Sequence, residues 1–341
     1  MASQNAKKLE RKLHRFFIQD KRFRFVNKLP SGATGNCVCF EETHPQTQNT
    51  RKIVLKYPND DDDRTIDAVK NEIGWLRVLR NASHIVNTIS IQNGPNAGLK
   101  GLDSVFIILE YMENGTLRQF IQRSEDTYVP NRILWSLFLC LARACVAMAW
   151  PPQQGQAEEP KYNIAPSSLS HWDIHDENLL FGHLGVMSEH ALVPILKLID
   201  FDNAAERDEE DETDTIDIED FDDELELGRH RRGRGATNVG MRANVLDVGM
   251  IMTRILAKDR TMGEGGCREF IQHEHPYLDD DLQLLIIRCL AADPMNRPKL
   301  DELLCGTFNA VLTKTYRNTR HQNRETDARI RDIIQRDIFN A

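Results

Sequence analysis

The sequence lacks a long apolar run. No stretch of about 18 uncharged apolar residues occurs, and runs such as residues 105–109 have only the length of a strand. The first 24 residues are rich in charge and contain no apolar core of a secretion signal. We therefore expect neither a membrane span nor secretion, and a location in the cytoplasm or the nucleus.

Paired cysteine motifs are also missing. The seven cysteines are scattered and odd in number, and no two CxxC pairs could build a zinc site. Cys37 and Cys39 alternate along one expected strand, so they share a face on which ordinary packing is the simplest explanation. The sequence thus predicts reduced thiols without an assigned chemistry.

What is present is typical of a folded globular protein. Of 341 residues, 40% are hydrophobic and 28% are charged, which excludes global disorder and fibrous repeats. The length suits two average domains, or one bilobed domain with extensions.

The net charge of -9 is unevenly distributed. Residues 206–226 contain fourteen acidic side chains against one arginine, and an arginine cluster follows at 229–234. This block is expected to be a solvated insert that pairs with the arginines. Thr213, Thr215 and Thr237 are candidate phosphorylation sites, with an unmodified charged linker as the alternative.

The pattern of apolar residues changes along the chain. A short amphipathic helix is expected within residues 1–20, followed by short strands over 23–55, a helix over 67–80, and strands near 85–91 and 105–110. After Asn114 and Gly115 the pattern is mainly helical, with loops at 151–166 and 206–240. The later helices are expected at 133–150, 245–257, 281–290, 300–311 and 326–339.

The strongest chemical signal lies at residues 171–178, with the sequence HWDIHDEN, followed by the apolar strand 179–181. This segment resembles the catalytic loop HRDxxxxN of the protein kinase family, with Trp172 in place of arginine. The resemblance implies that Asp173 orients the substrate hydroxyl and that Asn178 holds a magnesium ion.

Three more positions follow the same family order. Residues 195–202, ILKLIDFD, deliver Asp200 where the family has the magnesium-binding aspartate of DFG. Residues 53–56, IVLK, resemble VAIK, so Lys56 is expected to contact the ATP phosphates and Glu72 to pair with it.

The nucleotide-covering loop and the hinge have weaker signals. Residues 29–37 overlay the glycine-rich loop and retain Gly32 and Gly35, whose backbone N–H groups are expected to cover the phosphates. Residues 109–117 resemble the hinge. The resemblance implies that backbone groups of Glu110 and Met112 bind adenine, that Leu109 is the gatekeeper, and that Leu180 also belongs to the nucleotide site.

Several positions depart from the family pattern. Pro30 replaces the first loop glycine, and Asp202 replaces the glycine of DFG, where it could add a second carboxylate near the metals. His175 stands where serine/threonine kinases carry a catalytic lysine, so its positive charge is only fractional at neutral pH.

The expected platform for a protein substrate is altered as well. Residues 288–298 resemble the late motif of protein kinases, with Arg297 as its buried arginine, but no APE motif supplies the usual glutamate. The acidic insert or Glu264 could substitute. Asn244 stands where the family has an aspartate.

The sequence therefore predicts an α+β bilobal protein kinase fold: a small antiparallel-sheet N-lobe with one main helix, and a mainly helical C-lobe. The expected division is a helical extension over 1–22, an N-lobe over 23–112, a C-lobe over 113–312 with an acidic activation-segment insert at 203–240, and a helical extension over 313–341.

The predicted function is ATP-dependent phosphorylation of a protein hydroxyl, of the serine/threonine type, with ATP and Mg²⁺. No nucleic acid or membrane partner is expected. One alternative is an ATP-binding pseudokinase. A second is a small-molecule phosphotransferase of the choline kinase or aminoglycoside phosphotransferase type, which the Asp-x-His sequence at Asp173 and His175 resembles.

Overall fold

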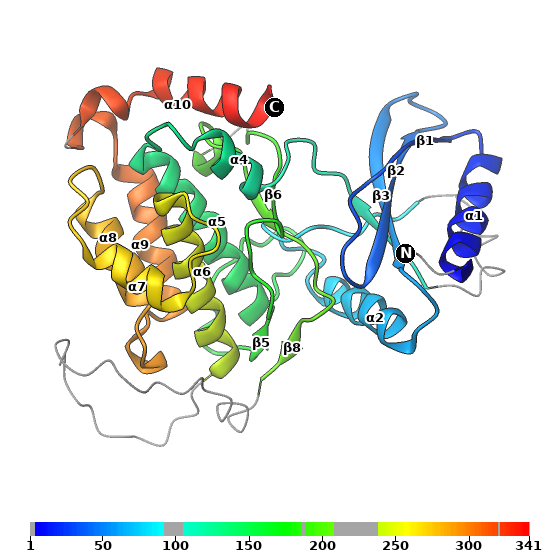
Figure 1. Cartoon of the computed structure of the whole chain (residues 1–341), viewed down its shortest axis with the longest axis horizontal. Helices are drawn as coiled ribbons and strands as arrows, with labels where there is room; N and C mark the ends of the chain where they lie inside the picture. Colours follow the sequence, from blue (N-terminus) through cyan, green and yellow to red (C-terminus); the bar gives the residue numbers. More distant parts are fainter. Residues whose placement is uncertain (1–3, 92–104, 186–187, 208–237, 320, 341) are drawn as a thin grey trace.

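The structure is a computed structural model, and it describes residues 4–91, 105–185, 188–207, 238–319 and 321–340. A sheet with two helices forms the N-terminal region, and a larger, mainly helical C-terminal region lies beside it (Figure 1). The expected α+β fold class is therefore confirmed. The acidic block, the arginine cluster and Thr213, Thr215 and Thr237 lie outside the described residues, except for the first two positions of the block.

The N-terminal sheet has four antiparallel strands in the order β1-β2-β3-β4. Its longest ladder pairs β2 with β3 over nine residues, and a bulge lies between Phe25 and Asn27 of β1. The strand expected near 85–91 does not form a ladder, because only Ile85 and Thr88 make isolated bridges. The strands are β1 (Phe23–Lys28), β2 (Gly35–Thr43), β3 (Thr50–Pro58) and β4 (Ile107–Glu110).

The expected amphipathic helix is present as α1 (Gln4–Gln19) and covers the face of the sheet away from the C-terminal region (Figure 1). Leu13 and Phe17 are buried against the sheet, and the Phe17 ring stacks on Phe40 with centroids 5.1 Å apart. These contacts form a separate core cluster. The first helix is therefore part of the fold and not a loose extension.

The main helix of this region, α2 (Asp63–Val78), begins four residues earlier than the apolar pattern predicts. Asp62 explains the early start, because its carboxylate accepts the backbone N–H of Arg64 at 2.9 Å and caps the helix. Val69 and Leu76 face inward, and Glu72 lies on the same buried face.

The C-terminal region is built around α5 (Asn131–Ala149), a helix that is apolar nearly all round. It is long and apolar enough to cross a membrane by composition, but 94% of the relevant window is buried inside the fold, as in a core helix. Helices α6 and α9 pack on it. Two short ladders complete this region: a two-residue ladder joins β5 (Leu169–Ser170) to β8 (Ala205–Glu206), and a three-residue ladder joins β6 (Leu179–Phe181) to β7 (Leu196–Leu198).

The later helices follow the predicted pattern with three differences, the first being that α4 was not predicted as a separate helix. Helix α6 begins at Val239, earlier than predicted, because the Asn238 side chain caps it by accepting the N–H of Met241 at 2.9 Å. Helix α7 was not predicted, since its two glycines break the apolar pattern. The helices are α4 (Leu117–Arg123), α6 (Val239–Ala257), α7 (Glu264–Gln272), α8 (Asp280–Cys289), α9 (Leu300–Thr313) and α10 (Asp327–Ile334), which continues as a π-helical turn η6 (Gln335–Phe339).

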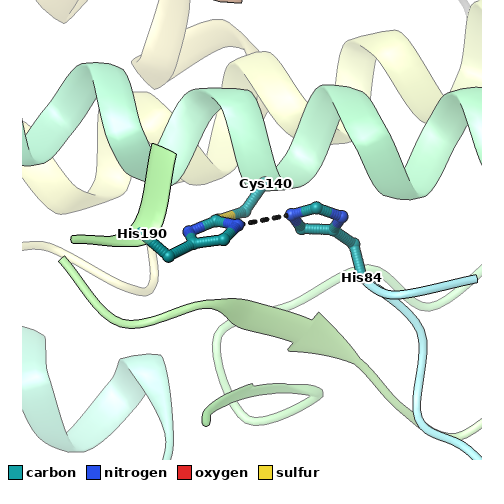
Figure 2. Close-up of side chains that lie close together, drawn as sticks. All are labelled: His84, Cys140 and His190. Carbon is teal, nitrogen blue, oxygen red and sulfur yellow. Dashed lines mark hydrogen bonds between the residues drawn. The ribbon is translucent and has the colours of Figure 1, made fainter. Parts of the chain in front are cut away.

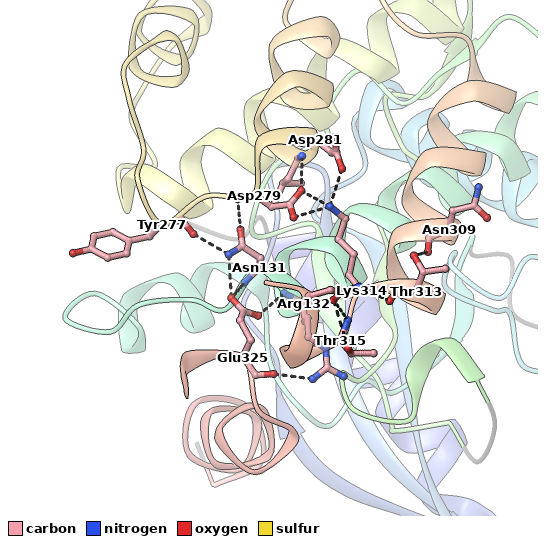
Figure 3. Close-up of polar contacts among 12 residues, drawn as sticks. Asn131, Arg132, Tyr277, Asp279, Asp281, Asn309, Thr313, Lys314, Thr315 and Glu325 are labelled. Atoms are coloured by element: carbon pink, nitrogen blue, oxygen red, sulfur yellow. Dashed lines mark hydrogen bonds and ion pairs between the residues drawn. The ribbon is translucent and has the colours of Figure 1, made fainter. Parts of the chain in front are cut away.

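The C-terminal end of the chain is tied to the start of α5 by a buried carboxylate (Figure 3). Glu325 is fully buried and accepts the backbone N–H groups of Asn131 at 2.8 Å and Arg132 at 3.1 Å, together with the Tyr128 hydroxyl at 3.0 Å. Helix α5 has no side-chain cap of its own. Glu325 therefore caps the central helix from almost 200 residues away.

Candidate active site between the two regions

The structure brings Lys56, Glu72 and Asp200 together. Nζ of Lys56, on β3, lies 2.6 Å from Oε2 of Glu72, on α2, and 2.5 Å from Oδ1 of Asp200, which follows β7. The glutamate is on the buried face of α2, so its carboxylate needs a partner there. Lys56 thus makes two ion pairs, one within the N-terminal region and one with the C-terminal region.

Burial and charge act in opposite directions on this group. Burial alone would lower the pKa of Lys56, but the carboxylates of Glu72 and Asp200 outweigh it and hold that pKa above its ordinary value. Burial raises the pKa of Glu72, and the Lys56 ammonium opposes that rise. Lys56 therefore remains a cation in its buried position.

The catalytic-loop residues lie close to one another. The Asn178 side-chain N–H donates to the backbone carbonyl of Asp173 at 3.0 Å and to its Oδ2 at 3.3 Å. Nε2 of His175 lies 3.5 Å from the same Oδ2. This contact is the largest cause of the lowered pKa of Asp173 and of the raised pKa of His175. Asp173 is thus held as a half-exposed carboxylate.

The tautomer of His175 is set by its own loop. The backbone N–H of Glu177 donates to Nδ1 of His175 at 3.2 Å, so in the neutral ring the proton sits on Nε2 and faces Asp173. The Ile199 N–H in turn donates to the Asn178 carbonyl at 2.9 Å. This bond joins the catalytic loop to the residue before Asp200.

Two residues of the site have left-handed backbone conformations. Trp172 has φ 65° and Asp200 has φ 70°. Neither is glycine, so each costs about 1–3 kcal/mol and must be held by its surroundings. The exposed Trp172 ring is covered by the guanidinium of Arg207, 3.2 Å from the ring centroid. Strain of this kind concentrates at functional sites.

Phe201 and His171 form the support beneath the site. Phe201 is fully buried and its ring meets the His171 ring edge to face, with centroids 4.6 Å apart. His171 contacts the Ile199 carbonyl at 3.0 Å through Nε2, and burial lowers its pKa to about 4. A neutral His171 can therefore donate one hydrogen bond without placing a charge in the core.

Asn244, which replaces the family's aspartate, anchors the catalytic loop to α6. Its Oδ1 accepts the backbone N–H of His171 at 3.1 Å, and its Nδ2 donates to the Leu169 carbonyl at 2.8 Å. The side chain is buried. The amide therefore uses its donor as well as its acceptor, which a carboxylate could not do.

Asp202 connects the strand end to the glycine-rich loop. The Thr34 hydroxyl donates to Oδ2 of Asp202, and burial beside Asp200 raises the pKa of Asp202. Side chains of α2 hold the following residues: Asn71 donates to the Asp202 carbonyl at 2.9 Å, and Trp75 donates to the Ala204 carbonyl at 2.9 Å. Sequence reasoning missed Asn71 and Trp75. Their only signal is a spacing of four on the helix that carries Glu72.

The glycine-rich loop lies directly over the charged residues. A Cβ built on Gly35 would stand 2.9 Å from Cε of Lys56, so only glycine fits there. A Cβ on Gly32 would stand 4.0 Å from Oδ2 of Asp200. The Asn59 side chain closes the loop by donating to the carbonyls of Gly32 and Ala33. In this conformation the loop is closed onto Asp200.

The expected adenine-binding residues lie on β4, just after it, and on β6. Leu109 and Glu110 are on β4 and pair with Val54 and Ile53 of β3. Met112 is buried and lies beside Gly182, which is two residues after Leu180 of β6. The Glu110 carboxylate accepts from Lys197 Nζ at 2.6 Å and from the Asn87 backbone N–H at 2.7 Å, which fixes β4 against β7.

Arg297 is held by backbone carbonyls, and among the described residues it makes no ion pair with Glu264. Its guanidinium donates to the carbonyls of Ala291 and Arg242, each at 2.9 Å. Glu264 instead pairs with Arg268, its neighbour on α7. Burial lowers the pKa of Arg297. Among the described residues no carboxylate makes an ion pair with Arg297, but the charge of Glu264 opposes the effect of burial on its pKa. The other candidate, the acidic insert, lies almost entirely outside the described residues.

The donor atoms present fit a magnesium ion. The Asn178 Nδ2 is used by Asp173, which leaves its Oδ1 free to face a ligand, and Asp200 uses only Oδ1 for Lys56. Asp202 adds a carboxylate next to them. Oxygen atoms from carboxylates and amides are the ligands that magnesium prefers.

The fold and this group of side chains define a protein-kinase-like domain. Residues 23–151 match the family model described as protein tyrosine and serine/threonine kinase, which supports protein kinase activity in general. The match includes Lys56 and Glu72 and ends before Asp173 and Asp200. No curated protein matches the chain.

Proposed function

We propose that the protein is a serine/threonine protein kinase that uses ATP and magnesium to phosphorylate a protein hydroxyl. The observation that carries the proposal is the contact of Lys56 with Glu72 and Asp200, at 2.6 Å and 2.5 Å, across residues that lie 16 and 144 positions away in the chain. Chance does not place these residue types together in the family's order.

Each residue of this site has a role in the proposal. Lys56 binds the phosphates, and Glu72 keeps its ammonium in position. Asp173, a carboxylate at neutral pH, orients the attacking hydroxyl and takes its proton. Asn178 and Asp200 would hold magnesium, which would neutralise negative charge on the phosphates. Gly32 and Gly35 cover the phosphates, while Leu109, Glu110, Met112 and Leu180 form the adenine site.

His175 supplies a positive charge at the transferring group. In the proposal it replaces the lysine of serine/threonine kinases, and Asp173 raises its pKa, so the cation is more populated than in a free histidine. Arg297 and its setting between α6 and η3 (Pro294–Asn296) favour a protein kinase over a small-molecule phosphotransferase, because the late motif is typical of protein kinases.

A second candidate is an ATP-binding pseudokinase that acts through its partners. The specific observation in its favour is the loop closed over Asp200, with Thr34 bonded to Asp202. For either candidate we place the protein in the cytoplasm or the nucleus, with ATP and a protein as its partners.

One experiment separates the candidates. Binding of ATP with magnesium and phosphate incorporation into a mixed protein substrate are measured for the wild type and for Asp173→Asn, with Glu177→Gln as a control in the same loop. The kinase proposal expects wild-type incorporation that falls about 10²-fold or more in Asp173→Asn, while binding and the control are unchanged. Binding without incorporation in the wild type identifies the pseudokinase. A parallel assay with small alcohols tests the small-molecule phosphotransferase, which is identified by incorporation into the alcohols and not into protein.

A further inference from the structure

Two histidines and a cysteine meet in the core of the C-terminal region, away from the site above (Figure 2). His84 follows α2, Cys140 lies on α5, and His190 ends the short helix η1 (Ser188–His190). Nε2 of His84 and Nε2 of His190 are 3.1 Å apart, and both atoms and the Cys140 sulfur lie within 4.8 Å of one another. Figure 2 shows both rings directed at each other beside the sulfur.

The outer face of His84 is fixed by a buried carboxylate. Nδ1 of His84 lies 3.2 Å from Oε2 of Glu158, and Oε1 of Glu158 accepts the backbone N–H groups of Ser83 and His84. A carboxylate beside Nδ1 favours the tautomer of His84 that carries its proton there, which leaves a lone pair on Nε2 facing the cluster.

The other two members are also prepared for a ligand. His190 is half-buried and directs Nε2 at the His84 ring. The Leu196 backbone N–H donates to the Cys140 sulfur at 3.4 Å, a hydrogen bond that a metal-bound sulfur would accept. Two histidines that only pack together in a core need to share one proton. Such a pair would require neither the carboxylate behind His84 nor the N–H directed at the Cys140 sulfur.

The spacing suits a tetrahedral metal. Zinc bonds of about 2.0–2.1 Å to nitrogen and about 2.3 Å to sulfur separate neighbouring ligand atoms by about 3.3–3.6 Å. The observed nitrogen separation of 3.1 Å and the 4.8 Å limit for the set require only small side-chain movements. Glu189 lies outside this set and pairs with Arg143, so a water would complete the tetrahedron.

We propose that His84, Cys140 and His190 form a structural zinc site, with Glu158 as the carboxylate that orients His84. Two imidazoles and one thiolate are a ligand set typical of zinc. The spacing of metal-binding motifs in the sequence could not reveal the site. Its three ligands lie in distant segments of the chain, and only one of them is a cysteine.

The site has a mechanical consequence for the candidate active site. His84 follows the helix that carries Glu72, and its carbonyl accepts the N–H of Leu198, two residues before Asp200. Cys140 contacts the start of β7 through Leu196. Zinc would therefore fasten both Glu72's helix and Asp200's strand to the central helix α5.

The test measures metal on the whole purified chain. After removal of loosely bound metal, zinc content is determined by mass spectrometry, and chelated protein is titrated with Co²⁺ and with Zn²⁺. We expect one zinc per chain and a thiolate-to-cobalt charge-transfer band with a tetrahedral visible spectrum. Zinc should also raise the Tm of the chelated protein in a concentration-dependent way.

Variants assign the metal to these residues. Cys140→Ser should remove the charge-transfer band and weaken zinc binding about a hundredfold or more, and Glu158→Gln should weaken it about tenfold to hundredfold. The matched control is Cys145→Ser, a buried thiol on the same helix, which should leave both unchanged.

Two results overturn the proposal. One is a wild-type chain that holds only trace metal and gives no charge-transfer band with Co²⁺. The other is zinc retained equally by Cys140→Ser and Cys145→Ser, which would place any metal elsewhere. Because the readouts are metal content and spectra, they do not depend on kinase activity.

Discussion

At the scale of single residues, the site combines residues that match the protein kinase motifs with replacements that make contacts of their own. Asp202 and Asn244 stand in unexpected positions, yet each makes hydrogen bonds that the family's residue could not make. A glycine in place of Asp202 would release Thr34, and an aspartate in place of Asn244 would lose a donor. Whether a departure from the motif harms the site therefore depends on the contacts that the replacing residue makes.

We predict that activity depends on pH through His175. Asp173 raises the pKa of His175, so the ring stays protonated to a higher pH than a free histidine. Its positive charge is lost as the pH rises through this raised pKa. The value of kcat/KM should therefore fall on the alkaline side. His175→Lys should flatten this fall, and His175→Gln should lower kcat/KM about tenfold, less than the loss of a direct oxyanion-hole donor.

The measurement is a profile of kcat/KM from about pH 6 to about pH 8. His183→Gln is the control, because His183 is exposed on a loop after β6. An alkaline fall that persists unchanged in His175→Lys would show that another group titrates.

We also predict that releasing the closed loop strengthens ATP binding. Thr34→Val removes the hydroxyl that donates to Asp202, and the loop must lift from Asp200 to admit phosphates. A hydrogen bond of this kind contributes about 0.5–1.5 kcal/mol, so the Kd for ATP should fall about twofold to tenfold. Calorimetric titration measures it. Ser31→Ala, which affects a bond within the same loop, should have a smaller effect, and weaker binding in Thr34→Val would contradict the prediction.

At the scale of elements, helices in this protein are held by side chains from far along the chain. Helix α6 holds the catalytic loop through Asn244, α2 holds the strand after Asp200 through Asn71 and Trp75, and Glu325 caps α5. Local propensity predicts that these helices exist. It does not predict what fixes their ends and positions.

We predict that Asn244→Asp destabilises the protein although aspartate is the family's residue. The carboxylate would lose the donor to the Leu169 carbonyl, 2.8 Å away, and would face that oxygen in a buried position. The free energy of unfolding should fall by about 1–3 kcal/mol. Asn309→Asp, the same change at an exposed site of α9, should have little effect, and equal stability of both variants would refute the prediction.

A second prediction concerns the cap of α5. Glu325→Ala leaves the backbone N–H groups of Asn131 and Arg132 without their acceptor in the core. We expect a loss of about 2–3 kcal/mol in the free energy of unfolding, measured with urea. Glu274→Ala, at an exposed position, provides the control. A loss no larger than that of the control would show that α5 is held without Glu325.

At the scale of the whole molecule, the sheet separates two hydrophobic clusters. Along β4, Ile108 belongs to the cluster under α1, whereas Ile107 and Leu109 belong to the main core. One face of the sheet is thus covered by α1 and the other looks toward the C-terminal region. The first helix therefore supports the strand that carries Lys56 from behind.

We predict that Phe17→Ala loosens the sheet before it affects the C-terminal helices. Phe17 is fully buried between Phe23 and Phe40, so its removal should cost about 3–5 kcal/mol. Hydrogen exchange should show faster exchange in β1 to β3, with α5 unchanged. Ile18→Ala is the control, because that side chain is 48% exposed. Equal loss of protection in α5 would contradict two separable clusters.

The sequence by itself determined the fold class, most helices and the order of Lys56, Glu72, Asp173, Asn178 and Asp200, because apolar periodicity and motif spacing are local properties of the chain. Only the tertiary structure decided the closed loop on Asp202, the carbonyl partners of Arg297, the remote cap of α5 and the meeting of His84, Cys140 and His190. Apart from the bond of Arg297 to Ala291, six positions away, these contacts join residues tens to hundreds of positions apart, and their geometry exists only after the elements have packed.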